Sequence, residues 1–187
     1  PPRTWKEWVD IAEFFTRPEQ DLWGYAISGV GWAFFYNEYQ RAGLLNTGIY
    51  PYIDLEAKTT SVNSTAGVEL LVTLAKLAKC SPPGWETGDW FSFSDKMFAD
   101  GKVAMWHNWY YPWPMFNNPN TSKVAGKVGV APTPTRNEEI RPLGWLSGGG
   151  LVVNKYATPE QKAAAAKFLE WFLSDSVQEK MYMTGKL

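Results

Sequence analysis

Apolar positions near the start of the chain recur at steps of three and four residues, which is typical of a helix with one buried face. Thr4 precedes this pattern and Glu7 follows three residues later, the arrangement of a helix-capping box. Pro18 ends the segment. We therefore expect a helix over residues 5–15, with its core-facing side formed by Trp5, Trp8, Ile11 or Ala12, and Phe15.

The same spacing predicts a second long helix, which Asn63 or Ser64 begins and which extends to about Lys79. Its apolar residues at i, i+3, i+4 and i+7 indicate one buried stripe. The residues expected on that stripe are Val68, Leu71, Val72 and Ala75.

A third helical pattern begins at Thr158, where Pro159 and Gln161 complete another capping box. A last helix is expected after Ser174, through residue 183. The third helix is expected to bury Ala165, Phe168, Leu169 and Phe172.

Shorter apolar runs between these helices predict strands at residues 22–28, 101–105 and 128–131. Another helix is expected over residues 32–42, and a short one, capped by Ser92 or Ser94, is expected to end near Ala99. Strands that alternate with helices indicate an α/β fold.

The most unusual stretch follows the strand expected at residues 101–105. It places six ring side chains within eight positions, and Pro112 and Pro114 exclude a long regular element there. Flat side chains with polar tips on irregular backbone are typical of a binding surface. The rings are Trp106, His107, Trp109, Tyr110, Tyr111 and Trp113, and we expect Trp106 to belong to the core.

Two other tryptophans are candidates for ligand contact because glycines beside them let backbone approach a ligand. Trp32 follows Gly29 and Gly31, and Trp145 precedes Gly148 and Gly149. Asn108 and His107 add groups that can hydrogen-bond to hydroxyls. The competing interpretation is that these rings pack against other aromatic residues such as Trp85 or Trp90.

Composition narrows the function. The 187 residues carry a net charge of -1 and no long basic run, which argues against nucleic-acid binding. No apolar run reaches the ~20 residues needed to cross a bilayer, so we expect no direct membrane insertion. One cysteine, Cys80, excludes an internal disulfide and is expected to be a buried thiol. One histidine makes a metal site improbable, and no cofactor is expected.

Catalysis has weak support. The acid pairs Glu86 with Asp89 and Asp95 with Asp100 are the best local candidates for the two carboxylates of a glycosidase. We expect Asp95 and Asp100 instead to lie at a helix end and a turn. The sequence contains no nucleophile elbow, zinc-protease motif or phosphate-binding loop.

Five motifs in order resemble the extracellular solute-binding proteins of ABC sugar importers, the family that includes maltose-binding protein. They are TWKE at 4–7, the helix over 66–78, FADGKVAM at 98–105, VGVAPTP at 128–134, and the glycines at 148–149 followed by the helix over 164–173 with Ser174. The third of these, like the family's F-x-x-G-K-x-A-M, is the most specific.

This resemblance implies a two-lobe α/β fold of the type II periplasmic binding protein class. Residues 1–132 would form most of the second lobe, residues 133–144 a hinge or crossing segment, and residues 145–187 a segment that returns to the first lobe. The chain would then be a piece of a longer protein.

The resemblance also implies reversible binding of a sugar, with an oligosaccharide favoured by the number of aromatic residues, and delivery to a membrane permease. It implies no enzymatic activity and a periplasmic or extracellular location, with a lipid anchor at an N-terminus outside this chain as a further expectation. Aromatic residues shortly after the A-M pair stack on ligand in this family, which favours Trp109 and Tyr111. The alternative is a carbohydrate-active enzyme fragment or a glycan-binding module.

Overall fold

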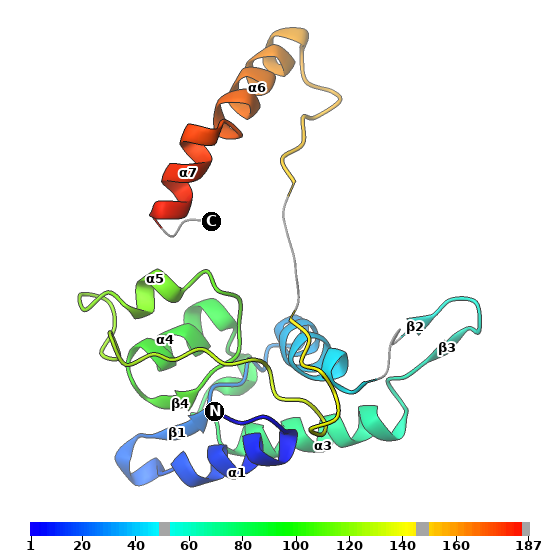
Figure 1. The fold of residues 1–187 in the computed structure, drawn as a ribbon, viewed down its shortest axis with the longest axis vertical. Helices are drawn as coiled ribbons and strands as arrows, with labels where there is room; N and C mark the ends of the chain where they lie inside the picture. Colours follow the sequence, from blue (N-terminus) through cyan, green and yellow to red (C-terminus); the bar gives the residue numbers. More distant parts are fainter. Residues whose placement is uncertain (49–52, 145–149, 185–187) are drawn as a thin grey trace. The chain divides into compact units, whose positions relative to one another are not determined.

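The computed structural model describes residues 1–48, 53–144 and 150–184 (Figure 1). The chain divides into two compact units, Pro1–Trp145 and Leu146–Leu187. Within the first range, seven side chains lie outside what the structure describes: those of Trp32, Phe35, Tyr36, Asn37, Arg41, Ala42 and Leu45.

The first helix, α1 (Trp5–Phe15), confirms the predicted bounds. The hydroxyl of Thr4 accepts a hydrogen bond of 3.2 Å from the Glu7 backbone N–H, as a capping residue should. The Glu7 carboxylate does not close the box but accepts from the backbone N–H of Arg3 at 2.6 Å. Phe15 was wrongly predicted to be core, since it is 37% exposed, whereas the helix buries Trp5, Trp8, Val9 and Ala12.

The central pair of strands is parallel and short. β1 (Trp23–Tyr25) pairs with β4 (Val103–Met105), and Trp23 lies opposite Val103. A 3-10 turn, η1 (Pro18–Gln20), precedes β1. Helix α1 packs against both strands, and α4 (Asp95–Ala99) packs against β4 (Figure 1). The sheet is therefore covered by helices, as parallel strands require.

The helix predicted over residues 32–42 forms, but the helical segment continues to residue 46 and most of it has the wider turns of a π-helix. It runs from α2 (Gly31–Ala33) through the π-helix η2 (Phe34–Gly43) to the 3-10 turn η3 (Leu44–Asn46). Glu38 on η2 is fully buried. Its carboxylate accepts from the Tyr25 hydroxyl at 2.6 Å and from the Ser28 backbone N–H at 3.1 Å, so it ties this segment to β1.

Helix α3 (Thr65–Lys79) begins at Ser64, whose hydroxyl accepts from the Gly67 backbone N–H at 3.2 Å. The predicted buried stripe is wrong. Val68, Leu71 and Val72 are 43–52% exposed and Ala75 is exposed as well, because the neighbouring apolar stripe packs against α1 and η2 instead. The residues that α3 does bury are Ala66, Gly67, Leu70, Leu74 and Leu77.

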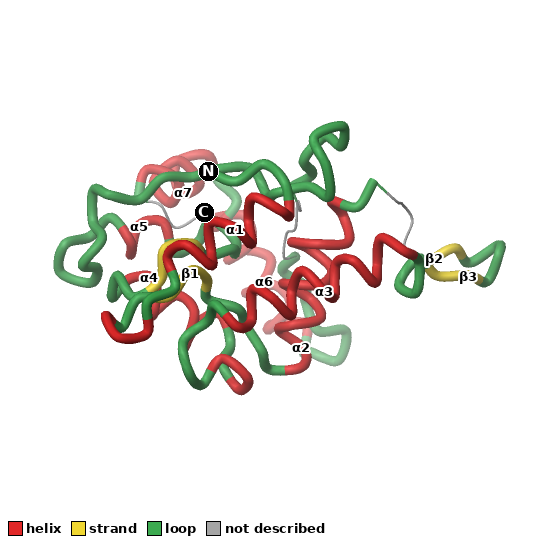
Figure 2. Tube along the Cα trace, turned by 90° about the horizontal axis from the view of Figure 1, so that it is seen from below, coloured by secondary structure: helices red, strands yellow, loops and turns green. Residues whose placement is uncertain are grey.

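A small antiparallel hairpin, β2 (Ile53–Asp54) and β3 (Thr59–Thr60), projects away from this core beyond α3 (Figure 2). After α3 the buried free thiol of Cys80 confirms its expected place. The segment between α3 and β4 then makes the 3-10 turn η4 (Trp85–Thr87), the π-helix η5 (Trp90–Ser94) and α4. Ser94 stands at the N-cap position of α4, as one of the two predicted residues, but its side chain makes no capping hydrogen bond. The side-chain cap lies earlier, at the start of η5, where Asp89 accepts from the Ser92 backbone N–H at 2.6 Å.

The strand predicted at residues 128–131 does not form. Val130 is 71% exposed, and no described strand pairs with this segment, so its apolar residues have no ladder to join. Beyond this segment the Thr135 backbone N–H donates to the Arg3 carbonyl at 2.9 Å. Arg136 then forms a bidentate ion pair with Glu69 of α3, in which Nε donates to Oε2 at 2.6 Å and Nη2 donates to Oε1 at 3.0 Å.

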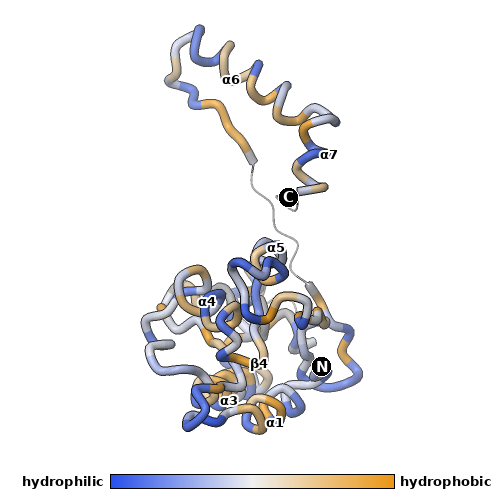
Figure 3. Tube along the Cα trace, turned by 90° about the vertical axis from the view of Figure 1, so that its left-hand side faces the viewer, coloured by the Kyte–Doolittle hydropathy of each residue, from blue (hydrophilic) through white to orange (hydrophobic). Residues whose placement is uncertain are grey.

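The second unit contains α6 (Pro159–Phe172) and α7 (Asp175–Met183). The capping box at Thr158 is confirmed in both directions, at 2.9 and 3.3 Å with Gln161. The burial predicted for Ala165, Phe168, Leu169 and Phe172 is wrong, because no residue of α6 is buried. Hydrophilic and hydrophobic stretches are mixed along this helix (Figure 3), and the described part of the unit contains no core against which it could pack.

Candidate ligand-binding site

β4 leads directly into the stretch 106–113, which we call the aromatic loop. Its first ring, Trp106, packs edge-on against Phe116 at 5.1 Å and lies 5.8 Å from Phe98. Phe116 belongs to α5 (Trp113–Phe116) and is buried. Trp106 therefore ties the loop to the buried Phe116, but its own ring is only partly buried and is not part of the hydrophobic core, so the core place predicted for it is wrong.

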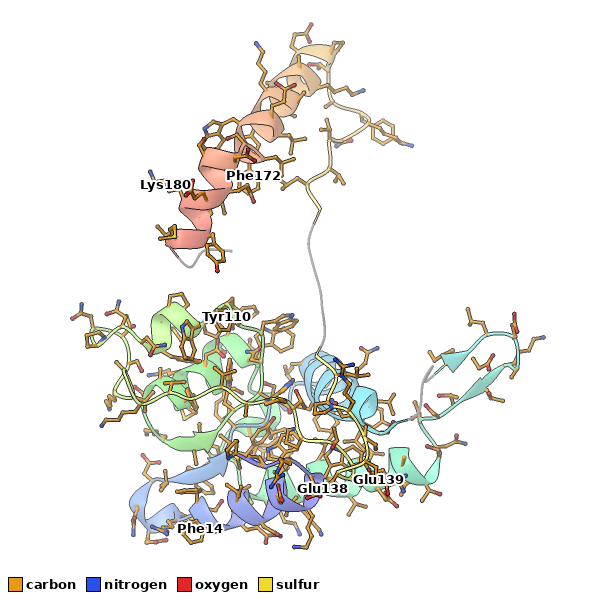
Figure 4. All side chains as sticks on the ribbon, viewed as in Figure 1. Phe14, Tyr110, Glu138, Glu139, Phe172 and Lys180 are labelled. Carbon is orange, nitrogen blue, oxygen red and sulfur yellow. The ribbon has the colours of Figure 1, made fainter. Side chains whose placement is uncertain are left out.

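The later rings of the loop form two groups on the surface. Tyr110 and Trp113 stack at 5.5 Å with an angle of 18° between their planes, and Tyr110 is 63% exposed (Figure 4). Trp109 packs edge-on against Trp90 at 4.9 Å, the packing contact that the competing interpretation expected. Tyr111 lies 5.3 Å from Phe91, and 45% of it remains exposed.

A buried carboxylate lies beneath these rings. Asp95, the first residue of α4, is 3% exposed. Its Oδ1 accepts from Asn108 Nδ2 at 3.1 Å, and its Oδ2 accepts from the hydroxyl of Tyr111. Asn108 Oδ1 in turn accepts from the Trp109 backbone N–H at 2.8 Å. Polar contacts thus fix the loop to the helix below it.

Burial raises the pKa of Asp95 from its ordinary value to about 6, against the opposing effect of the two hydrogen-bond donors. The nearby Asp89 carboxylate raises the pKa of Asp95 further, while the indole N–H of Trp106 lowers it slightly from beyond hydrogen-bond distance. Burial and the Asp95 carboxylate also raise the pKa of Tyr111 far above its usual range. Tyr111 therefore stays a neutral donor at any physiological pH.

A hollow of about 810 Å³ adjoins the loop on its inner side. Its walls are β4 and the loop, the inner face of α1, Tyr25, and residues 127–134. Consecutive residues of β4, Ala104 and Met105, both line it, so the hollow extends past the edge of the strand, because neighbouring strand side chains point to opposite faces. Lys127 is the only charged side chain among the described residues that line it.

The structure brings together five of the predicted ligand residues: Asn108, Trp109, Tyr110, Tyr111 and Trp113. Of these, all but Tyr111 line the hollow. Trp145, Gly148 and Gly149 lie outside the described residues, and so does the side chain of Trp32. Their predicted roles stay predictions.

Sequence reasoning missed the role of Asp95 and that of Phe91, which packs against Tyr111, whereas the competing interpretation had already named Trp90 as a packing partner. The expectation that Asp95 lies at a helix end was right, since it begins α4. A buried acid within a run of aromatic residues was the only available signal.

In the described part of the chain, no group of three or more His, Cys, Asp or Glu side chains is arranged to hold a metal ion. No described helix is both long and apolar enough to cross a membrane.

Comparison with known proteins gives a consistent picture. The family model for bacterial extracellular solute-binding proteins matches residues 1–187. An ABC transporter solute-binding protein from Agrobacterium radiobacter K84, solved in complex with ribitol, superposes with a TM-score of 0.80 at 26% identity, covering 100% of this chain and 46% of that protein. Maltose-bound MalE3 of T. maritima superposes equally well, with a TM-score of 0.80 at 27% identity and the same coverage.

A solute-binding protein from Thermotoga lettingae TMO, solved with alpha-D-tagatose, shares the fold at 22% identity with a TM-score of 0.73. This chain therefore spans about half the length of the solved proteins that it matches. Its fold is part of a two-lobe α/β architecture, as the sequence predicted.

Proposed function

The chain belongs to the family of bacterial extracellular solute-binding proteins, and on that premise we propose that it is part of the substrate-binding component of an ABC importer for a sugar or polyol. The observation that carries the proposal is the aromatic loop, placed at the carboxyl end of β4 with stacked and half-exposed rings. Related proteins were solved with ribitol and with maltose.

The chemistry of the loop suits a carbohydrate. A sugar has an apolar C–H face that a Trp or Tyr ring covers and a polar rim that hydroxyl and amide groups bind. Tyr110 and Tyr111 expose ring surface, and Asn108 lies beside them. No formal charge is needed to bind a neutral ligand, which agrees with the net charge of -1.

The hollow itself is less suited to a sugar. Its deeper walls include Trp8 and Tyr25, which belong to the hydrophobic core, and they offer few polar partners for a hydroxylated ligand. We therefore assign the ligand to the outer face of the aromatic loop. Trp145, Gly148 and Gly149, with Trp32, would contribute further contacts.

The proposed cycle involves binding and closure but no bond breaking. Residues 1–132 would form most of one lobe and residues 145–187 part of the other, with residues 133–144 crossing between them. Ligand binding would favour the closed arrangement of the lobes, as in periplasmic binding proteins generally. The closed form would then deliver its ligand to a membrane permease, from a periplasmic or cell-surface location with or without a lipid anchor.

A direct test uses the full-length protein that contains this chain. Tryptophan fluorescence is followed while a panel of sugars and polyols is added, and the bound ligand is then recovered and analysed. We expect saturable binding and recovery of the ligand unchanged. Recovery of a shortened or rearranged sugar would instead support the carbohydrate-active enzyme.

Two substitutions locate the site. Trp109→Ala or Tyr111→Ala is expected to weaken binding by at least about 1 kcal/mol, or about fivefold in Kd, because a stacked ring is lost. Phe14→Ala is the matched control, since Phe14 is 65% exposed on α1 and away from the loop. Unaltered affinity in both loop variants would mean that the rings serve packing only.

A further inference from the structure

The one buried carboxylate beneath the aromatic loop joins residues that are far apart in sequence. Asp95 accepts hydrogen bonds from Asn108 and Tyr111, which follow it by 13 and 16 residues. Both donors are neutral, and no described Lys, Arg or His forms an ion pair with Asp95. The hydrogen bonds of the carboxylate thus both come from the loop, and they add to the ring contacts of Trp106, Trp109 and Tyr111 that also hold the loop.

Each of these bonds constrains a different part of the loop. The Tyr111 hydroxyl bond fixes the ring on Phe91 while leaving 45% of the residue exposed. The Asn108 bond fixes the amide so that Oδ1 faces the Trp109 backbone N–H. If the Asn108 amide turned over, it would lose both contacts at once, because its NH₂ would face the Trp109 N–H and its oxygen would face the Asp95 carboxylate oxygen.

We propose that Asp95 is the positioning residue of the ligand-binding loop, holding Asn108 and Tyr111 in the orientation that meets the ligand without touching the ligand itself. This assignment rests on the proposed function for its role in binding. The holding of the loop can be tested without any ligand.

The arrangement also makes the loop sensitive to pH. An ionised carboxylate accepts both bonds, whereas a protonated one turns one oxygen into a donor and leaves one loop residue without its acceptor. The pKa of Asp95, raised to about 6, puts this change within reach of mild acid. The charged group nearest in effect is Asp89, and the neutral groups facing the carboxylate are Tyr111, Asn108 and the Trp106 indole.

The first experiment measures backbone amide hydrogen exchange in the ligand-free, full-length protein at pH 7.5. Asp95→Asn is expected to speed exchange in the peptide covering residues 106–113 by about tenfold, since an amide cannot accept from two donors as a carboxylate does. Asp100→Asn is the matched control, because Asp100 pairs with Lys96 at the other end of α4. Unchanged exchange in Asp95→Asn would overturn the assignment whether or not any sugar binds.

Should Asp95→Asn fail to fold, Tyr111→Phe tests the same bond with the ring retained. It is expected to speed exchange of the same peptide, because one of the two bonds to Asp95 is gone. Exchange equal to that of the wild type would count against the assignment.

The second experiment measures affinity for the best ligand of the panel between pH 5 and 7.5. Wild-type affinity is expected to fall about tenfold toward low pH with a midpoint near 6, and Asp95→Asn is expected to stay at the low level throughout. Tyr111→Phe should move the midpoint upward, because it removes a donor that favours the ionised form. The midpoint must persist in His107→Gln, since histidine ordinarily titrates near pH 6.5.

The outcomes separate the two proposals. Faster loop exchange in Asp95→Asn with no binding to any panel member would refute the proposed function and leave the positioning role standing. Normal sugar binding with a pH profile that Asp95→Asn does not change would refute the positioning role alone.

Discussion

Gly24, in the middle of β1, is the glycine at which adding a single methyl group should lower the stability of the fold most. A Cβ built there would lie 1.8 Å from the backbone carbonyl oxygen of Ala12 on α1, and 2.4 Å from its carbonyl carbon. The obstacle is backbone, so no side chain can turn aside to make room. Gly24→Ala must therefore push α1 away from the strand pair.

The expected loss of stability can be judged from the interactions that surround the contact between Gly24 and α1. Trp8 meets the ring of Tyr25 edge-on at 5.1 Å, and the Gly24 backbone N–H lies 3.1 Å from both the Thr16 hydroxyl and the Cys80 carbonyl. Overpacking in a core costs about 1–3 kcal/mol when side chains can adjust, so a backbone clash should cost at least about 3 kcal/mol. At an m-value of about 2 kcal/mol/M in urea, this lowers the unfolding midpoint by about 1.5 M.

The assay is urea unfolding of the full-length protein, followed by tryptophan fluorescence. Gly31→Ala is the control, since nothing lies within 4 Å of a Cβ there and Gly31 begins α2. That change should be neutral or stabilise by up to about 1 kcal/mol. Equal midpoints for Gly24→Ala and the wild type would refute the close packing of α1 on β1.

Three further predictions concern stability. Leu74→Ala should lower the free energy of unfolding by about 2–5 kcal/mol, because Leu74 is 1% exposed, whereas Val72→Ala, at 52% exposure, should lower it by less than about 0.5 kcal/mol. A larger loss of stability for Val72→Ala than for Leu74→Ala in urea unfolding would support the buried face predicted from sequence. Tyr25→Phe should lower the free energy of unfolding by about 2 kcal/mol, since the buried Glu38 carboxylate loses a hydrogen-bond donor. An unchanged urea midpoint would show that this hydrogen bond contributes nothing to stability. Because burial raises the pKa of Asp95 in the folded state, the stability that this group contributes is fully present below about pH 4 and is lost as pH rises through about 6. Asp95→Asn should remove this contribution from the pH dependence of the unfolding free energy. Identical pH profiles for Asp95→Asn and the wild type would contradict the burial of Asp95.

The features that sequence predicted correctly are local ones. The caps at Thr4, Ser64 and Thr158 depend on groups within three residues, and all three form. The position of β4 follows from a short apolar run before an aromatic one. Such features can be predicted because the residues that form them are close in sequence.

The predictions failed where the structure of one segment depends on contact with another segment that is distant in sequence. Helix α3 has apolar residues on two faces, so periodicity alone cannot tell which face α1 covers. Residues 128–131 have the composition of a strand but lack a neighbour to pair with. The bonds from Asp95 to Asn108 and Tyr111 depend on the path of a whole loop, which no spacing rule predicts.

The short parallel sheet has one more consequence, for anyone who produces these 187 residues by themselves. Among the described strands only β1 pairs with β4, and the other side of β4 borders the apolar hollow. An unpaired strand edge next to apolar side chains is a template for recruiting another chain. The isolated segment should therefore aggregate through strand addition, and a charged residue placed beside that edge, for example Ala104→Lys, is expected to improve its solubility.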